Sequence, residues 1–195
     1  MSTNALAEHL SLTPGAVSGM LKRLGEMHLV VHEPYRGVRL TAAGEKVALE
    51  VIRHHRLLEA YLAEALGMPW DRVHAEAEVL EHYISDELGD LIAEALGDPK
   101  RDPHGDPIPD RQLALPDDET RALAELEPGE EGIFTVVSDR DPSMLRYLAE
   151  RDICPGVGLK VEDKQPFDGP VFVRVGDEVH ALGRALARSM RVSVA

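Results

Sequence analysis

The long helical stretch over residues 41–97 constrains the fold of this chain more than any other feature. Residues 41–66 repeat apolar side chains at helical spacing, and Gly67 and Pro69 end the pattern. A second helical pattern begins near residue 70 and continues to residue 97. Together they predict a helical domain. The candidates for its apolar core, or equally for a dimer interface, are Val73, Leu80, Ile84, Leu88 and Leu91.

The second helical pattern contains two imidazoles and two carboxylates in the short sequence VHAEAEVLEH, residues 73–82. At about 100° per residue, a helix would place all four on one face. They are His74, Glu78, Glu81 and His82. No lysine or arginine occurs in residues 73–99, and like charges one turn apart repel each other. A divalent metal is therefore one candidate to neutralise this strip, and the alternative is a solvated acidic helix face.

A matching pair lies on the preceding helical segment. The sequence HHRLLEAYL places His55 and Glu59 four residues apart, so they share a helix face. The two sets could converge in the groove between the helices. Imidazole and carboxylate ligands suit divalent Mn, Fe, Co or Zn ions. His104 and His180 have no partner at ligand spacing, and we expect no metal role for them.

Residues 3–40 predict two short helices and a β-hairpin. Thr13 is the expected N-cap of the second helix and Pro14 its first residue. This order of elements is typical of a winged helix-turn-helix, although a helical pair with a hairpin is also a generic pattern.

In the DNA-binding interpretation, the second helix enters the major groove and its N-terminal residues face the bases. Candidates for base and shape contacts are Thr13, Pro14, Gly15, Ala16, Ser18 and Gly19. Lys22, Arg23, Arg36 and Arg39 could meet phosphates. Tyr35 and Arg36, at the hairpin tip, could touch the backbone or the minor groove.

The rest of the chain divides into a linker and a β domain. Residues 98–124 are dense in Pro, Gly and Asp and predict a linker, whereas residues 125–195 contain short strand-like runs separated by turns, with one helix. That pattern fits a small β-barrel. The expected class is α+β, with a DNA-binding domain over 1–40 and a metal-binding and dimerisation domain over 41–97.

Charge is unevenly distributed along the chain. The net charge is −14, yet residues 1–56 hold seven basic against five acidic side chains, so the remainder carries about −16. A near-neutral N-terminal region followed by an acidic remainder is compatible with DNA binding by the N-terminal region alone. A single cysteine, Cys154, and the absence of a signal peptide or an apolar run of about 18 residues predict a cytoplasmic protein without a membrane partner.

Motifs of metal-dependent and nucleophilic enzymes are absent from the sequence. It has no His-Glu-x-x-His, no Glu-x-x-His, no glycine-rich phosphate loop and no Gly-x-Ser-x-Gly. An enzyme is therefore not expected. Two other classes stay open: a metal-binding hydrolase or storage protein on a helical scaffold, and a winged-helix regulator that senses an organic ligand.

Over nearly its whole length the chain resembles the metal-dependent repressors of the diphtheria-toxin-repressor and manganese-transport-regulator family. The motifs that carry the resemblance are LTPGAVSGMLKRLGEMHLV, LTAAGEKVA, HHRLLE, VHAEAEVLEHYISDEL and DPHGDPIP. The resemblance implies a winged helix-turn-helix, a helical metal-binding and dimerisation domain, and an SH3-like barrel. It also implies a homodimer that binds a pseudo-palindromic site in double-stranded DNA.

The resemblance further implies two metal sites. Glu78, Glu81 and His82 match the primary, activating site. An ancillary site is implied at His55, Glu59, His74 and, from the barrel, Asp141 with Asp139 as the alternative. Glu78 stands where iron-type members have cysteine, which favours Mn(II) over Fe(II), with Co, Zn and Cd as surrogates. The resemblance also implies a helix before residues 3–10 that supplies a primary ligand; we expect either that the given sequence starts after this helix or that the protein lacks it.

Overall fold

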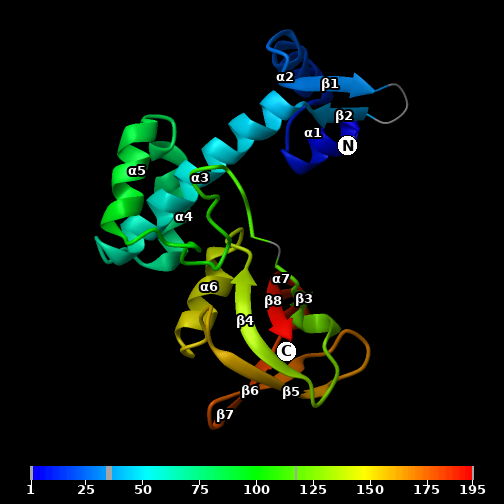
Figure 1. Cartoon of the computed structure of the whole chain (residues 1–195). Helices are drawn as coiled ribbons and strands as arrows, with labels where there is room; N and C mark the ends of the chain where they lie inside the picture. Colours follow the sequence, from blue (N-terminus) through cyan, green and yellow to red (C-terminus); the bar gives the residue numbers. More distant parts are fainter. Residues whose placement is uncertain (1, 34–36, 117, 195) are drawn as a thin grey trace. The chain divides into compact units, whose positions relative to one another are not determined.

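The computed structural model describes residues 2–33, 37–116 and 118–194. The chain divides into two compact units, residues 1–52 and residues 53–195 (Figure 1). Within the described ranges, no helix has the length and apolar character needed to cross a membrane.

The first unit consists of two helices and a two-stranded antiparallel hairpin, as the sequence predicts. Its elements are α1 (Thr3–His9), α2 (Pro14–Glu26), β1 (Val30–Glu33) and β2 (Gly37–Leu40). The Thr13 hydroxyl accepts a hydrogen bond from the Ala16 N–H at 3.2 Å, and Pro14 follows it as the first helical residue. The predicted N-cap of α2 is therefore confirmed. Val17 is buried and anchors α2 to the rest of this unit.

Helix α3 (Ala42–Glu64) begins directly after the hairpin. The Thr41 hydroxyl donates to the His28 carbonyl at 2.7 Å and accepts from the Gly44 N–H at 3.0 Å, which caps the helix start. A Cβ on Gly44 would lie 1.9 Å from the Leu29 carbonyl oxygen. Only glycine allows the helix to start so close to that backbone. From Arg53 onward, α3 belongs to the second unit.

Two further helices complete the helical part of the second unit, α4 (Trp70–Leu80) and α5 (Asp86–Ala95). Apolar side chains from the three helices form one core. Its buried members are Leu57, Leu58, Ala60, Leu62, Val73, Ala77, Ile92, Ala93 and Ile108. Of the five apolar residues singled out in the sequence, Val73 is in this core and Ile84 packs against it. Leu80, Leu88 and Leu91 are exposed in the single chain.

The single helix predicted over residues 70–97 is wrong, because α4 ends at Leu80 and α5 starts at Asp86. The Ser85 hydroxyl accepts a hydrogen bond from the Leu88 N–H at 3.2 Å and caps a new helix. Asp86 and Glu87 stand in its first turn, where the helix dipole favours negative charge. The local N-cap signal outweighs the continuous charge and apolar pattern.

The segment after α5 is ordered against the helical core instead of serving as a free linker. Arg101 and Pro107 pair in a short bridge, Ile108 joins the core, and His104 is buried. Gly105 has a φ of +90°, and a Cβ there would lie 1.8 Å from the Thr135 carbonyl oxygen of the β domain. The loop can approach the β domain this closely only because residue 105 is glycine.

The C-terminal part is an antiparallel sheet with the strand order β3-β8-β4-β5-β6-β7. Its strands are β3 (Arg121–Ala122), β4 (Glu131–Val137), β5 (Gly158–Lys164), β6 (Val171–Val175), β7 (Glu178–Leu182) and β8 (Met190–Val194). Helix α6 (Pro142–Ala149), helix α7 (Arg184–Ser189) and the short 3-10 helix η1 (Leu123–Glu125) connect them. Phe134, Leu148 and Val173 are among the fully buried core residues. The predicted small β domain is thus confirmed, whereas β3, η1, α7 and β8 have no counterpart in the sequence prediction.

Candidate metal centre and nucleic-acid interface

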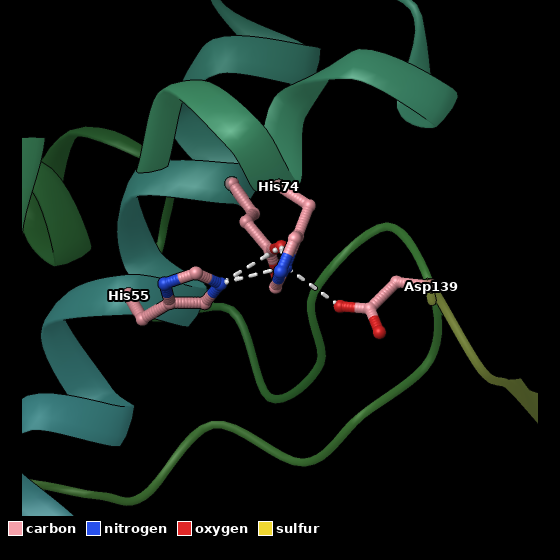
Figure 2. Close-up of side chains that lie close together, drawn as sticks. His55, His74 and Asp139 are labelled. Carbon is pink, nitrogen blue, oxygen red and sulfur yellow. Dashed lines mark hydrogen bonds and ion pairs between the residues drawn. The ribbon is translucent and has the colours of Figure 1, made fainter. Parts of the chain in front are cut away.

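Helices α3 and α4 bring three of the predicted ligands together (Figure 2). Nε2 of His55 lies 3.1 Å from Oε1 of Glu59 and 3.1 Å from Nδ1 of His74. The same Glu59 oxygen lies 3.2 Å from Nδ1 of His74. The convergence expected from the two helical patterns is therefore present in the structure.

The β domain adds one acidic side chain to this group. Oδ2 of Asp139 lies 2.8 Å from Nδ1 of His74 (Figure 2). Asp141, which the family resemblance placed at this position, is exposed, and its carboxylate caps α6 by accepting from the Ser143 N–H at 2.9 Å. The structure therefore places the alternative residue, Asp139, and not Asp141 in the group. Ligand atoms of His55, Glu59, His74 and Asp139 all lie within 4.8 Å of one another.

These donors fit a divalent transition ion, since neutral imidazole and carboxylate together suit Mn, Fe, Co and Zn. Two ligands of one ion, each at about 2.1 Å, are at most ~4.2 Å apart, and the neighbouring ligand atoms of the group lie 2.8 to 3.2 Å apart. We name it the ancillary group: His55, Glu59, His74 and Asp139.

Ionisation of the ancillary group follows from its burial and its contacts. Burial by itself lowers the pKa of His55, but hydrogen bonds to Glu59 and Glu81 outweigh it and raise the pKa to about 9. Burial by itself raises the pKa of Glu59, yet contacts with His104 and His55 hold it well below its usual range. A metal ion therefore has to displace protons from this group.

The three residues expected in the primary site, Glu78, Glu81 and His82, are less close to one another; we name them the primary set. Glu81 lies at the end of α4, where its Oε2 is 2.6 Å from Nδ1 of His55, while Glu78 and His82 are exposed. Among the described residues, Glu78, Glu81 and His82 are not a group whose three ligand atoms lie within 4.8 Å of one another. Since a carboxylate only accepts, the short contact makes Glu81 the acceptor for the His55 Nδ1–H, which leaves His55 Nε2 facing the ancillary group.

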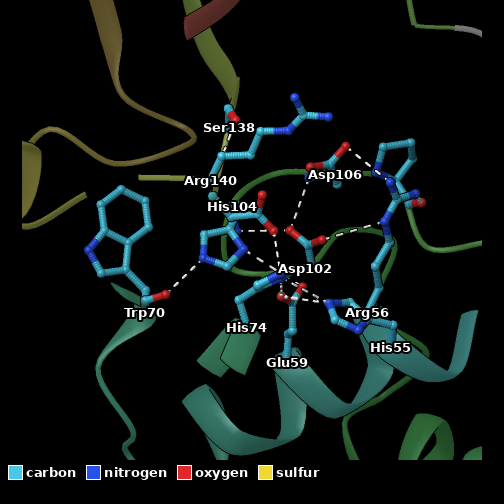
Figure 3. A network of polar contacts seen from close by, with 12 residues as sticks. His55, Arg56, Glu59, Trp70, His74, Asp102, His104, Asp106, Ser138 and Arg140 are labelled. Atoms are coloured by element: carbon cyan, nitrogen blue, oxygen red, sulfur yellow. Dashed lines mark hydrogen bonds and ion pairs between the residues drawn. The ribbon is translucent and has the colours of Figure 1, made fainter. Parts of the chain in front are cut away.

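A second buried group was missed by the sequence analysis. Glu59, Asp102 and His104 are exposed by 1%, 7% and 0%, and their ligand atoms also lie within 4.8 Å of one another (Figure 3). We name it the buried group. His104 and Asp102 lie in a Pro/Gly/Asp-rich segment without ligand spacing, so only the tertiary fold brings them to Glu59. The burial of His104 by itself lowers its pKa, but the contact with Glu59 outweighs it and raises the pKa to about 9.

Arg56 is the basic neighbour of the buried group. Its guanidinium donates to the Asp106 carboxylate at 3.2 Å and to the Pro107 carbonyl at 2.6 Å, and its Nε is 3.6 Å from Oδ2 of Asp102 (Figure 3). Burial, and then the charge of Glu59, raise the pKa of Asp102 to about 7. One guanidinium thus faces more carboxylate charge than it neutralises.

The predicted DNA-contacting residues of α2 lie on an exposed surface of the first unit. Those that are exposed are Thr13, Pro14, Gly15, Ala16, Ser18, Gly19, Lys22 and Arg23, together with Arg39 on β2. An added Cβ at Gly15 or Gly19 would meet no atom within 4 Å, so this side of α2 is open. Tyr35 and Arg36, the predicted wing contacts, lie outside the described residues.

Taken together, the fold and the site define a protein with a helix-turn-helix head, a helical domain that holds ligand clusters, and a C-terminal β domain. Three families match these parts: the iron dependent repressor N-terminal DNA binding domain at residues 1–38, the iron dependent repressor metal binding and dimerisation domain at residues 41–110, and the FeoA domain at residues 121–194.

Similar proteins agree with this assignment. The diphtheria toxin repressor of Corynebacterium jeikeium is 33% identical over 82% of this chain and 67% of its own length. The iron-dependent repressor IdeR of Mycobacterium leprae is 28% identical over 96% and 86%. The regulator MntR of Lysinibacillus sphaericus is 35% identical over 45% of this chain and 65% of its own length, just under two thirds.

Among solved structures, a manganese-dependent transcriptional repressor in complex with manganese matches with a TM-score of 0.92 and 39% identity, over 100% of this chain and 91% of that one. ScaR with bound Cd²⁺ matches with a TM-score of 0.82 and 28% identity, over 99% and 91%. The chain therefore belongs to the family of iron- and manganese-dependent repressors that includes the diphtheria toxin repressor, IdeR and MntR. This family consists of transcriptional repressors and not of enzymes.

Proposed function

We propose that this chain is a homodimeric repressor of metal-uptake genes that a divalent metal activates for DNA binding. The observation that carries the proposal is the ancillary group, in which His55, Glu59 and His74 on two helices meet Asp139 of the β domain. An ion bound there would tie together two parts of the chain that are far apart in sequence. That is a suitable place for a metal to control a conformational equilibrium.

Mn(II) is the favoured activator and Fe(II) the alternative. The ancillary group offers only imidazole and carboxylate ligands, and the proposed primary set of Glu78, Glu81 and His82 likewise contains no thiol. Hard oxygen ligands suit Mn(II), although they also accept Fe(II). Co(II), Zn(II) and Cd(II) are expected to act as surrogates, in line with a solved relative that contains Cd²⁺.

In this mechanism a bound cation would replace the imidazole protons as the positive charge among the clustered carboxylates. Glu81 accepts the Nδ1–H of His55 and so orients the imidazole toward the ancillary group. The hydrogen bond between His55 of the ancillary group and Glu81 of the primary set links the two, so that binding at one would change the other. The DNA-competent arrangement then gains population in proportion to its preference for metal.

The exposed side of α2 is the proposed DNA-reading surface. Its small residues, Gly15, Ala16, Ser18 and Gly19, leave few hydrogen-bond donors for the bases, so methyl contacts and DNA shape would contribute to recognition. Lys22 and Arg23 are expected to contact phosphates. Two such heads in a dimer would read a pseudo-palindromic site with half-sites one or more helical turns apart.

The test is binding of the full-length chain to DNA upstream of the manganese-uptake genes of its own organism. Fluorescence anisotropy at fixed salt, with Mn(II) or with chelator, is expected to show tight binding only with metal. The double variant Lys22→Ala/Arg23→Ala should weaken DNA binding at least tenfold. It should also make the slope of log K against log salt concentration shallower, by the amount expected for the loss of about two phosphate contacts per DNA-binding domain. Lys160→Ala removes an exposed lysine of the β domain and serves as the control.

Binding that is equally tight in chelator would contradict the metal switch. It would favour a winged-helix regulator that senses an organic ligand. Absence of specific binding under all conditions, together with uptake of many metal equivalents, would favour a storage protein instead.

A further inference from the structure

The buried group of Glu59, Asp102 and His104 lies beside the ancillary group and shares one residue with it. Glu59 uses its two carboxylate oxygens on two different sides. Oε1 faces His55 and His74 at 3.1 and 3.2 Å, whereas Oε2 faces Nδ1 of His104 at 3.7 Å. A carboxylate in this position can bind one cation through each oxygen.

The imidazole of His104 is fixed with one nitrogen free (Figure 3). Its Nε2 lies 2.8 Å from the Trp70 carbonyl oxygen, and because a carbonyl only accepts, Nε2 carries the hydrogen. Its Nδ1 is fully buried and has no hydrogen-bond partner among the described residues, since 3.7 Å to Glu59 is too long. This is the arrangement of a metal-ligating histidine, whose second ring N–H is held by a backbone carbonyl.

The backbone of the loop holds His104 and Asp102 rigidly in place. The His104 N–H donates to Oδ1 of Asp102 at 2.8 Å, and its carbonyl accepts from the Val137 N–H of β4 at 3.0 Å. The Trp70 ring stacks on the His104 ring at a centroid distance of 6.0 Å. The ring can therefore turn away from Glu59 only if several contacts break.

Several acidic side chains lie around the buried group. The guanidinium of Arg56 lies 3.2 Å from the Asp106 carboxylate and 3.6 Å from that of Asp102, while Glu59 faces the imidazoles of His55 and His104. Buried charges are stable only when they are paired or coordinate metals. A divalent ion at Nδ1 of His104 would replace the imidazole proton as the positive charge that faces Glu59.

We propose that Glu59, Asp102 and His104 bind a second divalent transition ion, which the Glu59 carboxylate bridges to the ion held by His55, His74 and Asp139. This inference rests on the proposed function, because it takes the ancillary ion as given. Bridged ions in two-metal sites are about 3.5–4 Å apart, a spacing that two oxygens of one carboxylate can span. The rival arrangement is a proton on Nδ1 of His104 that faces Glu59 without a second ion.

The test is the Mn(II) content and electron paramagnetic resonance spectrum of the full-length chain after equilibrium dialysis. Two bridged Mn(II) ions couple their spins, so the wild-type spectrum is expected to depart from the six-line signal of isolated Mn(II). Asp102→Asn and His104→Gln should each bind one equivalent less than wild type and restore the isolated signal. Asp102→Asn keeps the backbone hydrogen bonds to Oδ1 and therefore carries the test if His104→Gln unfolds.

Asp139→Asn is the matched control because it weakens the ancillary ion. If Asp102→Asn binds as much Mn(II) as wild type, or if the wild-type spectrum holds only isolated ions at saturation, the second ion is overturned. Equal Mn(II) content of Asp139→Asn and wild type would contradict the ancillary site, and with it the proposed function. The two failures are therefore distinguishable.

Discussion

At the scale of single residues, His55 is the centre of the candidate site, because both of its ring nitrogens have acidic partners. Nδ1 faces Glu81 at 2.6 Å and Nε2 faces Glu59 at 3.1 Å. These contacts raise the pKa of His55 from 6.5 to about 9, against the effect of burial. The metal-free protein thus keeps His55 charged at neutral pH.

The raised pKa of His55 has a consequence for stability. Its contribution is complete below about pH 6.5 and is lost as the pH rises through about 9, since the folded state binds the proton more tightly than the unfolded chain. We expect the contribution of His55 to the free energy of unfolding of the metal-free protein to fall by about 3 kcal/mol across this range. Urea titrations at a series of pH values measure it. His55→Gln should remove this part of the dependence and leave the part due to His104, whose pKa is also raised to about 9, whereas His32→Gln, at an exposed residue of β1, should keep both parts.

Gly105 offers a second residue-scale prediction. Gly105→Ala combines a φ of +90° with a Cβ 1.8 Å from the Thr135 carbonyl oxygen, so the loop must move. We expect a loss of about 2–4 kcal/mol in unfolding free energy, because a rigid backbone contact is broken. Gly129→Ala has a similar φ of +94° and no atom within 4 Å of its Cβ, so it should lose only about 1 kcal/mol. Equal losses would show that the close approach at Gly105 has no effect.

Residues could be predicted as ligands only where helical spacing relates them. His55 and Glu59 share a helix face at i,i+4, and His74 lies on the next helix, so the sequence predicts their convergence. Asp139 and His104 reach the site from loops, and loop positions follow from tertiary contacts that no periodicity encodes. The family resemblance therefore pointed to Asp141, which the structure uses to cap α6.

At the scale of secondary-structure elements, the break between α4 and α5 sets where the acidic strip ends. Glu81 and the exposed His82 stand in the turn that follows α4, so they are no longer held by helical geometry. The sequence contained a signal for this break, since Ser85 precedes two acidic residues, as in a typical helix start. The unbroken amphipathic pattern concealed it.

The cap at Ser85 can be tested directly. Ser85→Ala removes the acceptor of the Leu88 N–H and should lower the unfolding free energy by about 1 kcal/mol. Ser85→Asn supplies another side-chain oxygen and should restore most of the loss. Thermal unfolding monitored by circular dichroism is the measurement. An alanine variant as stable as wild type would mean that the cap contributes nothing.

At the scale of the whole molecule, the second unit joins helices to a sheet through the loop at residues 101–107. Strand alternation and turn residues were enough to predict the β domain. They could not predict that the segment expected to be a linker would pack against α3 and β4, because its buried groups are polar and its composition is that of a loop. The buried group takes two of its three residues, Asp102 and His104, from that loop.

We expect a metal held jointly by the helices and the β domain to activate DNA binding. The most direct measurement is the Mn(II) titration of DNA binding by wild type and Asp139→Asn, with Glu76→Gln, at an exposed α4 residue, as control. We expect Asp139→Asn to need at least tenfold more Mn(II) than wild type for half-maximal DNA binding, and Glu76→Gln to need the same Mn(II) concentration as wild type. The same Mn(II) requirement in all three proteins would contradict it.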